Sequence, residues 1–175
     1  MSDELDFSLD VTASGDELLS GTGRLARIGW LSKRIRKDDL FLLQDGSFSK
    51  LLFNETLECF VGGQFIATVV LGFSLVERTI AGRLSHVGEK KEAKGSSEEL
   101  MSSALRNGWL SQTEVDKINE LRALRNPVVH FREHLASSRP EVKATQSGRD
   151  TMQMLEGDAK RILEAAIQVL GKTAL

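Results

Sequence analysis

The chain has 175 residues, of which 41% are hydrophobic and 27% charged, so it can form one globular domain with a sizeable core but not two. Its formal net charge of −2 argues against a protein that coats nucleic acid through overall charge, although a local basic patch remains compatible with it. The single cysteine, Cys59, excludes an internal disulfide, and we expect it to pack in the core of a cytoplasmic protein.

Residues 1–47 are expected to precede the main domain as an acidic tail followed by a basic helix. The first ten residues carry acids and no basic residue, which is the reverse of a secretion signal. In the basic region at 24–37, Leu25, Ile28 and Leu31 recur at helical spacing and continue to Ile35, so we expect an amphipathic helix whose apolar stripe faces inward. The basic residues are interpreted as a solvated face, with an RNA-binding patch as the alternative.

Residues 48–84 show a helical pattern that is interrupted only by Gly62 and Gly63, which predicts a hairpin of two helices. The second helix, from about residue 64, is apolar on nearly every face up to Val76 and should be the most buried element. The run 59–76 is the only membrane candidate. Because polar residues such as Gln64 and Thr68 interrupt it, we interpret it as a buried helix and expect no membrane association.

After residue 84 the sequence predicts further helices that are separated by polar loops. Residues 85–97 read as a polar loop, and a short helix should begin after Ser96 and end at Asn107. Ser111 and Glu114 form a capping-box pattern that should start the next helix. Residues 137–150, which include Pro140 and Gly148, are expected to form a loop before a last helix at 158–170. No strand pattern of comparable length occurs, so the expected class is all-α, with residues 48–175 as one helical bundle.

The stretch 121–131 concentrates the residues best suited to chemistry. Asn126 and Pro127 are expected to act as the N-cap and first residue of a new helix reaching residue 135. His130 would then lie in its first turn, where the positive end of the helix dipole favours a neutral imidazole that can act as a general base. Backbone N–H groups at that helix start could hold a phosphate oxygen, and Arg125 could stabilise phosphate charge.

The order Arg125, Asn126, three residues and His130 resembles the Arg-x4–6-His signature of the HEPN superfamily of helical ribonucleases, and the similarity extends over about 48–170. It implies an up-and-down four-helix bundle and a homodimer, formed through the helices around 125–135, that brings both motifs into one cleft. The implied activity is metal- and cofactor-independent RNA cleavage by the ribose 2′-hydroxyl, with Arg125, Asn126 and His130 as catalytic residues. Glu77, Arg122 and Arg132 are the candidate positioning residues.

The same resemblance implies a role in toxin–antitoxin or defence systems and a possible antitoxin or regulator as partner. The toxin branch that pairs with nucleotidyltransferase antitoxins has a tyrosine two residues after the histidine. This chain has Arg132 there and contains no tyrosine at all.

Two alternatives remain open. In the first, Arg125 and Asn126 only stabilise a helix junction, with Arg125 paired to Glu77 or Glu120, and the chain is a non-catalytic HEPN-like dimer that binds a partner protein. In the second, His130 and His134 match the inverted zinc-protease pattern His-x-x-Glu-His, with both histidines on one helical face. That site requires a further ligand from the glutamates downstream.

Overall fold

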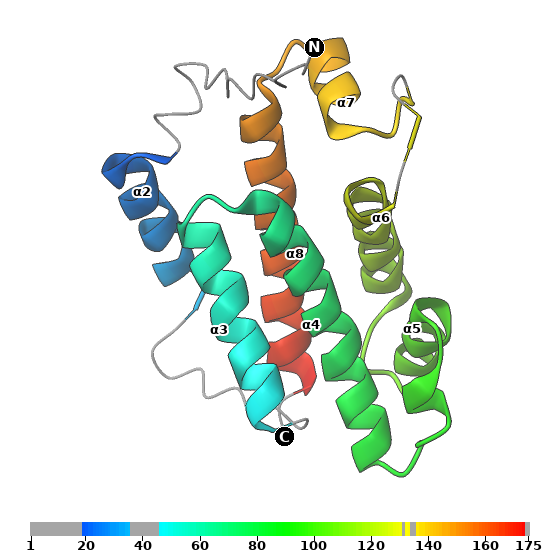
Figure 1. Cartoon of the computed structure of the whole chain (residues 1–175). Coiled ribbons are helices and arrows are strands. Elements are labelled where there is room, and N and C mark those ends of the chain that lie inside the picture. The colour runs from blue at the N-terminus through cyan, green and yellow to red at the C-terminus, as the bar shows by residue number, and fades with distance from the viewer. Residues whose placement is uncertain (1–18, 36–45, 131, 134–135, 174–175) are drawn as a thin grey trace, which may run out of the picture.

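The protein is described by a computed structural model that covers residues 19–35, 46–130, 132–133 and 136–173 (Figure 1). In this part of the chain all regular structure is helical, which confirms the all-α prediction. The elements are α2 (Gly21–Ser32), α3 (Ser47–Val61), α4 (Phe65–His86), the 3-10 turn η1 (Glu92–Lys94), α5 (Ser97–Arg106), α6 (Gln112–Val129), α7 (Pro140–Ser147) and α8 (Thr151–Thr173).

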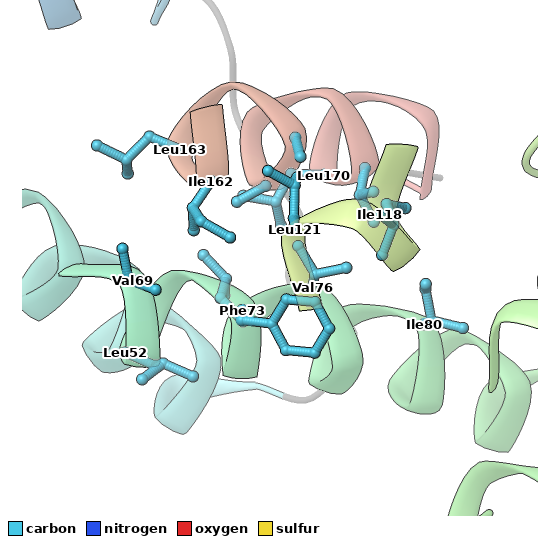
Figure 2. Packing of buried hydrophobic residues seen from close by; sticks show 14 of the residues in the cluster. Leu52, Val69, Phe73, Val76, Ile80, Ile118, Leu121, Ile162, Leu163 and Leu170 are labelled. Carbon is cyan, nitrogen blue, oxygen red and sulfur yellow. The ribbon is translucent and has the colours of Figure 1, made fainter. Parts of the chain in front are cut away.

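Helix α4 is the central element, as the sequence predicts. It packs along α3 and α8 and also contacts α5 and α6 (Figure 1). Figure 2 shows side chains of α4 directed toward residues of α6 and α8, while Leu52 of α3 lies on another side of the helix. Among the buried apolar residues of α4, the figure labels Val69, Phe73, Val76 and Ile80. They explain why this helix holds the fold together, since burial of such side chains stabilises by about 1.5–3 kcal/mol each.

The hairpin between α3 and α4 is confirmed, and its turn depends on glycine. Gly63 has φ = +80°, a left-handed conformation that other residues rarely adopt. Of the described helices, only α4 is long and apolar enough to cross a membrane, and 44% of its most apolar window is buried. Its packing between α3 and α8 accounts for that composition as part of a core.

Helices α4 and α8 lie close together at Gly72. A Cβ atom at this position would lie 2.4 Å from Cγ2 of Ile162 and 3.5 Å from Cγ2 of Thr56. The absence of a side chain at residue 72 therefore sets the distance between the two longest helices.

The predicted capping box at Ser111 is present, and the structure has a second one at Ser96, where a helix start was expected. The Ser96 side chain accepts from the Glu99 backbone at the start of α5, and Ser111 accepts from Glu114 at the start of α6. The Glu114 carboxylate also accepts hydrogen bonds from two α8 side chains, from Lys172 Nζ at 2.7 Å and from Gln168 Nε2 at 2.6 Å. The hydrogen bond from Lys172 is the largest cause that lowers the pKa of Glu114 to about 2, followed by those from Ser111.

The predicted apolar stripe of the N-terminal helix is confirmed only in its second half, where Leu31 is buried and Ile35 packs against the core. Leu25 is 70% exposed and Ile28 48% exposed, whereas Arg27 is 1% exposed. Both Nε and Nη2 of Arg27 donate to the carbonyl oxygen of Val61, at 3.1 and 2.9 Å. This carbonyl lies in the last turn of α3, where helix carbonyls lack an internal partner. A buried cation therefore anchors α2 to α3, and desolvation lowers its pKa.

Three further boundaries differ from expectation. Residues 140–147 form helix α7 rather than a loop, and the last helix begins at Thr151 rather than Asp158. The N-terminal helix ends at Ser32, and the remainder of its predicted range, from residue 36, lies outside the described residues. Cys59 is half-buried rather than a core residue, and burial raises the pKa of its thiol.

A candidate cleft around His130

His130 lies at the end of α6 and not at the start of a new helix. Helix α6 continues through Pro127 to Val129, and His130 is its C-cap with an extended backbone (φ −114°, ψ 138°). The His130 N–H donates to the Asn126 carbonyl at 3.0 Å, which continues the helix ladder. The expected N-cap role of Asn126 is therefore wrong, as is the dipole argument for a neutral imidazole, because the negative end of a helix dipole is the nearer one. The described residues between 130 and 139 are not helical.

The exposed His130 side chain borders a cleft of about 600 Å³ between the end of α6, helix α7, and the first turns of α4 and α8. Arg132 and Arg139 line the same cleft. Arg132 is exposed, and Arg139 forms an ion pair with Glu141, which also lies in the wall. The cleft therefore combines an accessible imidazole with two guanidinium groups, only one of which is paired to an acid among the described residues.

The rest of the cleft is apolar. Ile66 and Leu155 line it and also line an adjoining hollow of about 400 Å³ that reaches Gly63 and Met152. Ile66 is 52% exposed at the start of α4. Neither Arg139 nor this apolar floor was predicted from the sequence, and Glu141 was considered only as one of the downstream glutamates of the zinc alternative. The sequence feature that indicates Arg139 and Glu141 is Pro140, because a proline at this position starts α7 and makes Arg139 its N-cap.

Arg125 and Asn126 are not among the residues that line the cleft. The Arg125 guanidinium lies over the Phe73 ring, 5.7 Å from its centroid. Its Nε atom is buried and has no hydrogen-bond partner within the described chain, an arrangement that costs about 1–3 kcal/mol. A single copy of the chain thus brings His130 and Arg132 together but directs Arg125 toward α4.

The remaining predicted site residues lie apart from His130. Arg122 Nη2 forms an ion pair with Glu98 of α5 at 2.8 Å. Glu77 is half-buried on α4, and within the described ranges it makes no ion pair with Arg125. Glu120, the other acid considered as a partner of Arg125, lies 3.6 Å from Arg161 instead. Neither acid proposed for the structural alternative therefore neutralises Arg125.

The zinc alternative loses its geometric premise. It requires residues 130 and 134 to share a helical face, but the helix ends at Val129 and the described residues between 130 and 139 are not helical. His134 itself lies outside the described residues. In the part of the chain that is described, no three His, Cys, Asp or Glu side chains are grouped so that they could hold a metal ion.

No protein-family model, curated protein or solved structure matches this chain. The resemblance to HEPN domains therefore rests on the residues of the Arg125–His130 motif and on the helical pattern around it.

Proposed function

We propose that the protein is an endoribonuclease of the HEPN type that cleaves single-stranded RNA without a metal ion. The observation that carries the proposal is the position of His130, exposed at the end of α6 in a cleft that also presents Arg132 and Arg139. An imidazole that is accessible and close to cationic groups suits proton transfer at a phosphodiester. We further propose that α3, α4, α6 and α8 form the up-and-down four-helix core of such a domain.

In the proposed reaction, a nitrogen of His130 takes the proton of a ribose 2′-hydroxyl. The 2′-oxygen then forms a bond to the adjacent phosphorus, the bond from phosphorus to the 5′-oxygen breaks, and the departing oxygen takes a proton from water. The products are a 2′,3′-cyclic phosphate end and a 5′-hydroxyl end. Arg132 is suited to bind the phosphate, since a guanidinium can donate two parallel hydrogen bonds to its oxygens.

Arg125 is the proposed source of further phosphate stabilisation, and Asn126 of orientation, as the resemblance implies. Support comes from the Arg125 guanidinium, which is half-buried and forms no ion pair with an acid among the described residues, so its charge is not neutralised within the fold. Since this side chain does not reach the cleft of its own copy, we propose a two-fold dimer in which the motifs of both copies meet in one cleft, so that Arg125 of each copy serves His130 of the other.

The test compares wild type with His130→Ala on a defined single-stranded RNA in the presence of EDTA. We expect cleavage to fall about 100-fold or more, because loss of a general acid–base group costs about 10²–10⁴-fold. His86→Ala is the matched control, since His86 is also an exposed histidine at a helix end but does not line the cleft. Its activity should equal that of wild type, and the products should carry cyclic phosphate ends.

Equal cleavage by His130→Ala and wild type would refute the proposal. If the wild-type protein itself does not cleave RNA, the second candidate gains support, namely a non-catalytic dimer that binds a partner protein. The apolar floor of the cleft favours that candidate, with Ile66 52% and Val129 44% exposed, because exposed apolar patches mark interaction sites. In that case Ile66→Asp should weaken self-association, as measured by sedimentation, while His130→Ala should not.

A further inference from the structure

A second hollow, of about 320 Å³, lies against the later half of α4 and is bordered on the other side by η1 and by Lys90, shortly before it. Its lining contains small residues that leave the space open, together with cationic and hydroxyl groups. The lining residues are Arg78, Ala81, Gly82, Ser85, Lys90, Ala93 and Lys94. Three of these side chains are cationic and none is acidic, which is the composition of an anion-binding site.

This hollow is separate from the cleft around His130. Ile66 borders the cleft, whereas Gly82, sixteen residues later on the same helix, borders the hollow. At 1.5 Å per residue the two positions are about 24 Å apart along the axis of α4. No residue lines both sites, so each can be altered without touching the other.

The acids that neighbour the lining residues in the sequence, Glu77, Glu89 and Glu92, do not themselves line the hollow. The carboxylate of Glu89, which precedes Lys90, accepts from Arg106 Nη2 at 2.7 Å and from Asn107 Nδ2 at 3.0 Å. Both donors belong to the end of α5, so this carboxylate is committed to another helix. Within the described residues, Lys90 and Lys94 make no ion pair.

One of the cationic groups, that of Arg78, is restricted in its orientation by an aromatic ring. The Arg78 guanidinium lies over the ring of Phe48, 4.5 Å from its centroid, which restricts its orientation and so reduces the entropy lost on binding. The end of α4 contributes a partial negative charge of about half an electron. The charges of Lys90 and Lys94, which make no ion pair within the described residues, outweigh it, and their mutual repulsion would be relieved by an anion between them.

We propose that this hollow binds a phosphate group, with Arg78, Lys90 and Lys94 as its cationic partners and the Ser85 hydroxyl as a further donor. A guanidinium matches two phosphate oxygens, and ammonium groups act as point charges beside it. The volume lies at the lower end of small-molecule sites, which span about 300–1,000 Å³. It therefore suits free phosphate or the phosphate of a mononucleotide. The proposal is independent of RNA cleavage at His130.

The test is calorimetric titration of the full chain with inorganic phosphate and, separately, with adenosine monophosphate. The double variant Lys90→Gln/Lys94→Gln should bind both probes at least tenfold more weakly than wild type. The control is Lys33→Gln/Lys117→Gln, which removes the same total charge from two exposed lysines outside the hollow. It should bind as wild type does. Tighter binding of the nucleotide than of phosphate would assign the site to nucleotides, and equal binding would assign it to free phosphate.

A second variant protects the test against loss of folding. Ser85 is exposed near the end of α4, so Ser85→Glu should fold normally, as judged by circular dichroism, yet place a carboxylate among the three cations and abolish phosphate binding. Cleavage of RNA, if present, should be unchanged in this variant. The proposal is overturned if wild type shows no saturable binding of either probe, or if both double variants bind equally well.

Discussion

Replacing Gly72 with alanine should destabilise the protein even though alanine is the better helix former. The new Cβ would lie 2.4 Å from Ile162 Cγ2, where ordinary contacts are 3.4–4 Å, so about 1 Å of movement is required. Movement toward the other side is limited by buried Thr56, whose Cγ2 would be 3.5 Å away. Overpacking of this kind costs about 1–3 kcal/mol, and the gain in helix propensity offsets at most about 1 kcal/mol.

The net loss of unfolding free energy should therefore be about 1–2 kcal/mol, or about 2–8 °C in Tm for a chain of this size. The assay is urea denaturation followed by far-UV circular dichroism. Gly157→Ala in α8 is the matched control, because a Cβ there meets nothing within 4 Å. The same chemical change should stabilise the protein by about 0.5–1 kcal/mol at that position. The two variants thus have opposite predicted signs.

A double-mutant cycle identifies the cause. Ile162→Ala removes the clashing methyl group and alone should cost about 2–5 kcal/mol through the cavity that it leaves. Adding Gly72→Ala to that background should then cost nothing or stabilise, since the new methyl group occupies part of the cavity. If Gly72→Ala costs the same with and without Ile162, close helix approach is not the reason for the glycine.

Two further predictions concern charged groups within the fold. Arg27→Met should cost about 2–3 kcal/mol of unfolding free energy because the Val61 carbonyl loses both donors. Arg24→Met, on the exposed side of α2, should change the unfolding free energy by less than about 0.5 kcal/mol. Equal effects of the two substitutions in urea denaturation would contradict the anchoring role of Arg27. The pKa of Glu114 is about 2, below its ordinary 4.5, so its contribution is present above about pH 4.5 and is lost as the pH falls toward 2. Glu114→Gln should cost about 1–2 kcal/mol of unfolding free energy at neutral pH, a figure reduced because the partner lysine is exposed to solvent, and much less near about pH 3. The control Glu120→Gln should show no such dependence on pH. A similar dependence in that control would mean that the effect is not specific to the contacts of Glu114.

Features with local causes were predictable from the sequence. The capping boxes at Ser96 and Ser111 involve groups three residues apart, and the break at Gly62 and Gly63 reflects backbone freedom at those positions. Neither depends on what packs nearby. The length of α4 and its central position also followed from its composition, because a helix that is apolar on most faces must be covered on most faces.

The position of α2 was not predictable from its own periodicity. Leu25 and Ile28 form a helical stripe, but the face that is buried carries Arg27 instead. The cause lies 34 residues away at the Val61 carbonyl, which has no hydrogen-bond donor within α3. A guanidinium can donate to this oxygen, whereas a leucine side chain cannot. The other basic residue of this region with a clear partner, Arg34, forms an ion pair with Glu164 at 2.8 Å. Both groups are therefore engaged within the fold and not in a solvated basic face.

Helix α7 was missed although its signals are in the sequence. Pro140 is its first residue, and Gly148 ends it in the left-handed conformation at φ = +62°. Proline at the start and glycine after the end are the usual asymmetry of a helix, but we interpreted both as loop residues. Likewise, the Asp150 side chain accepts from the Gln153 backbone at 3.0 Å, which marks the true start of α8. At Pro127 the opposite error occurred, because a proline near the end of a helix does not have to begin another one.

The continuation of α6 through Pro127 changes what the spacing of Arg125 and His130 means. Side chains five residues apart on a helix point about 140° away from each other, which is why Arg125 lies over Phe73 while His130 borders the cleft. One copy of the chain does not bring the two groups together, so the proposed site needs the arginine of a second copy. Arg125→Ala and His130→Ala should each be inactive alone.

Co-expression of these two variants separates a shared site from a site within one chain. If each site takes Arg125 from one copy and His130 from the other, a mixed dimer contains one site with both residues intact and one site with neither. About half of randomly paired dimers are mixed, so the mixture should recover about a quarter of the wild-type RNA cleavage. If both residues of a site come from the same copy, no site in any dimer is intact and the mixture stays inactive, which would refute a site shared in this way.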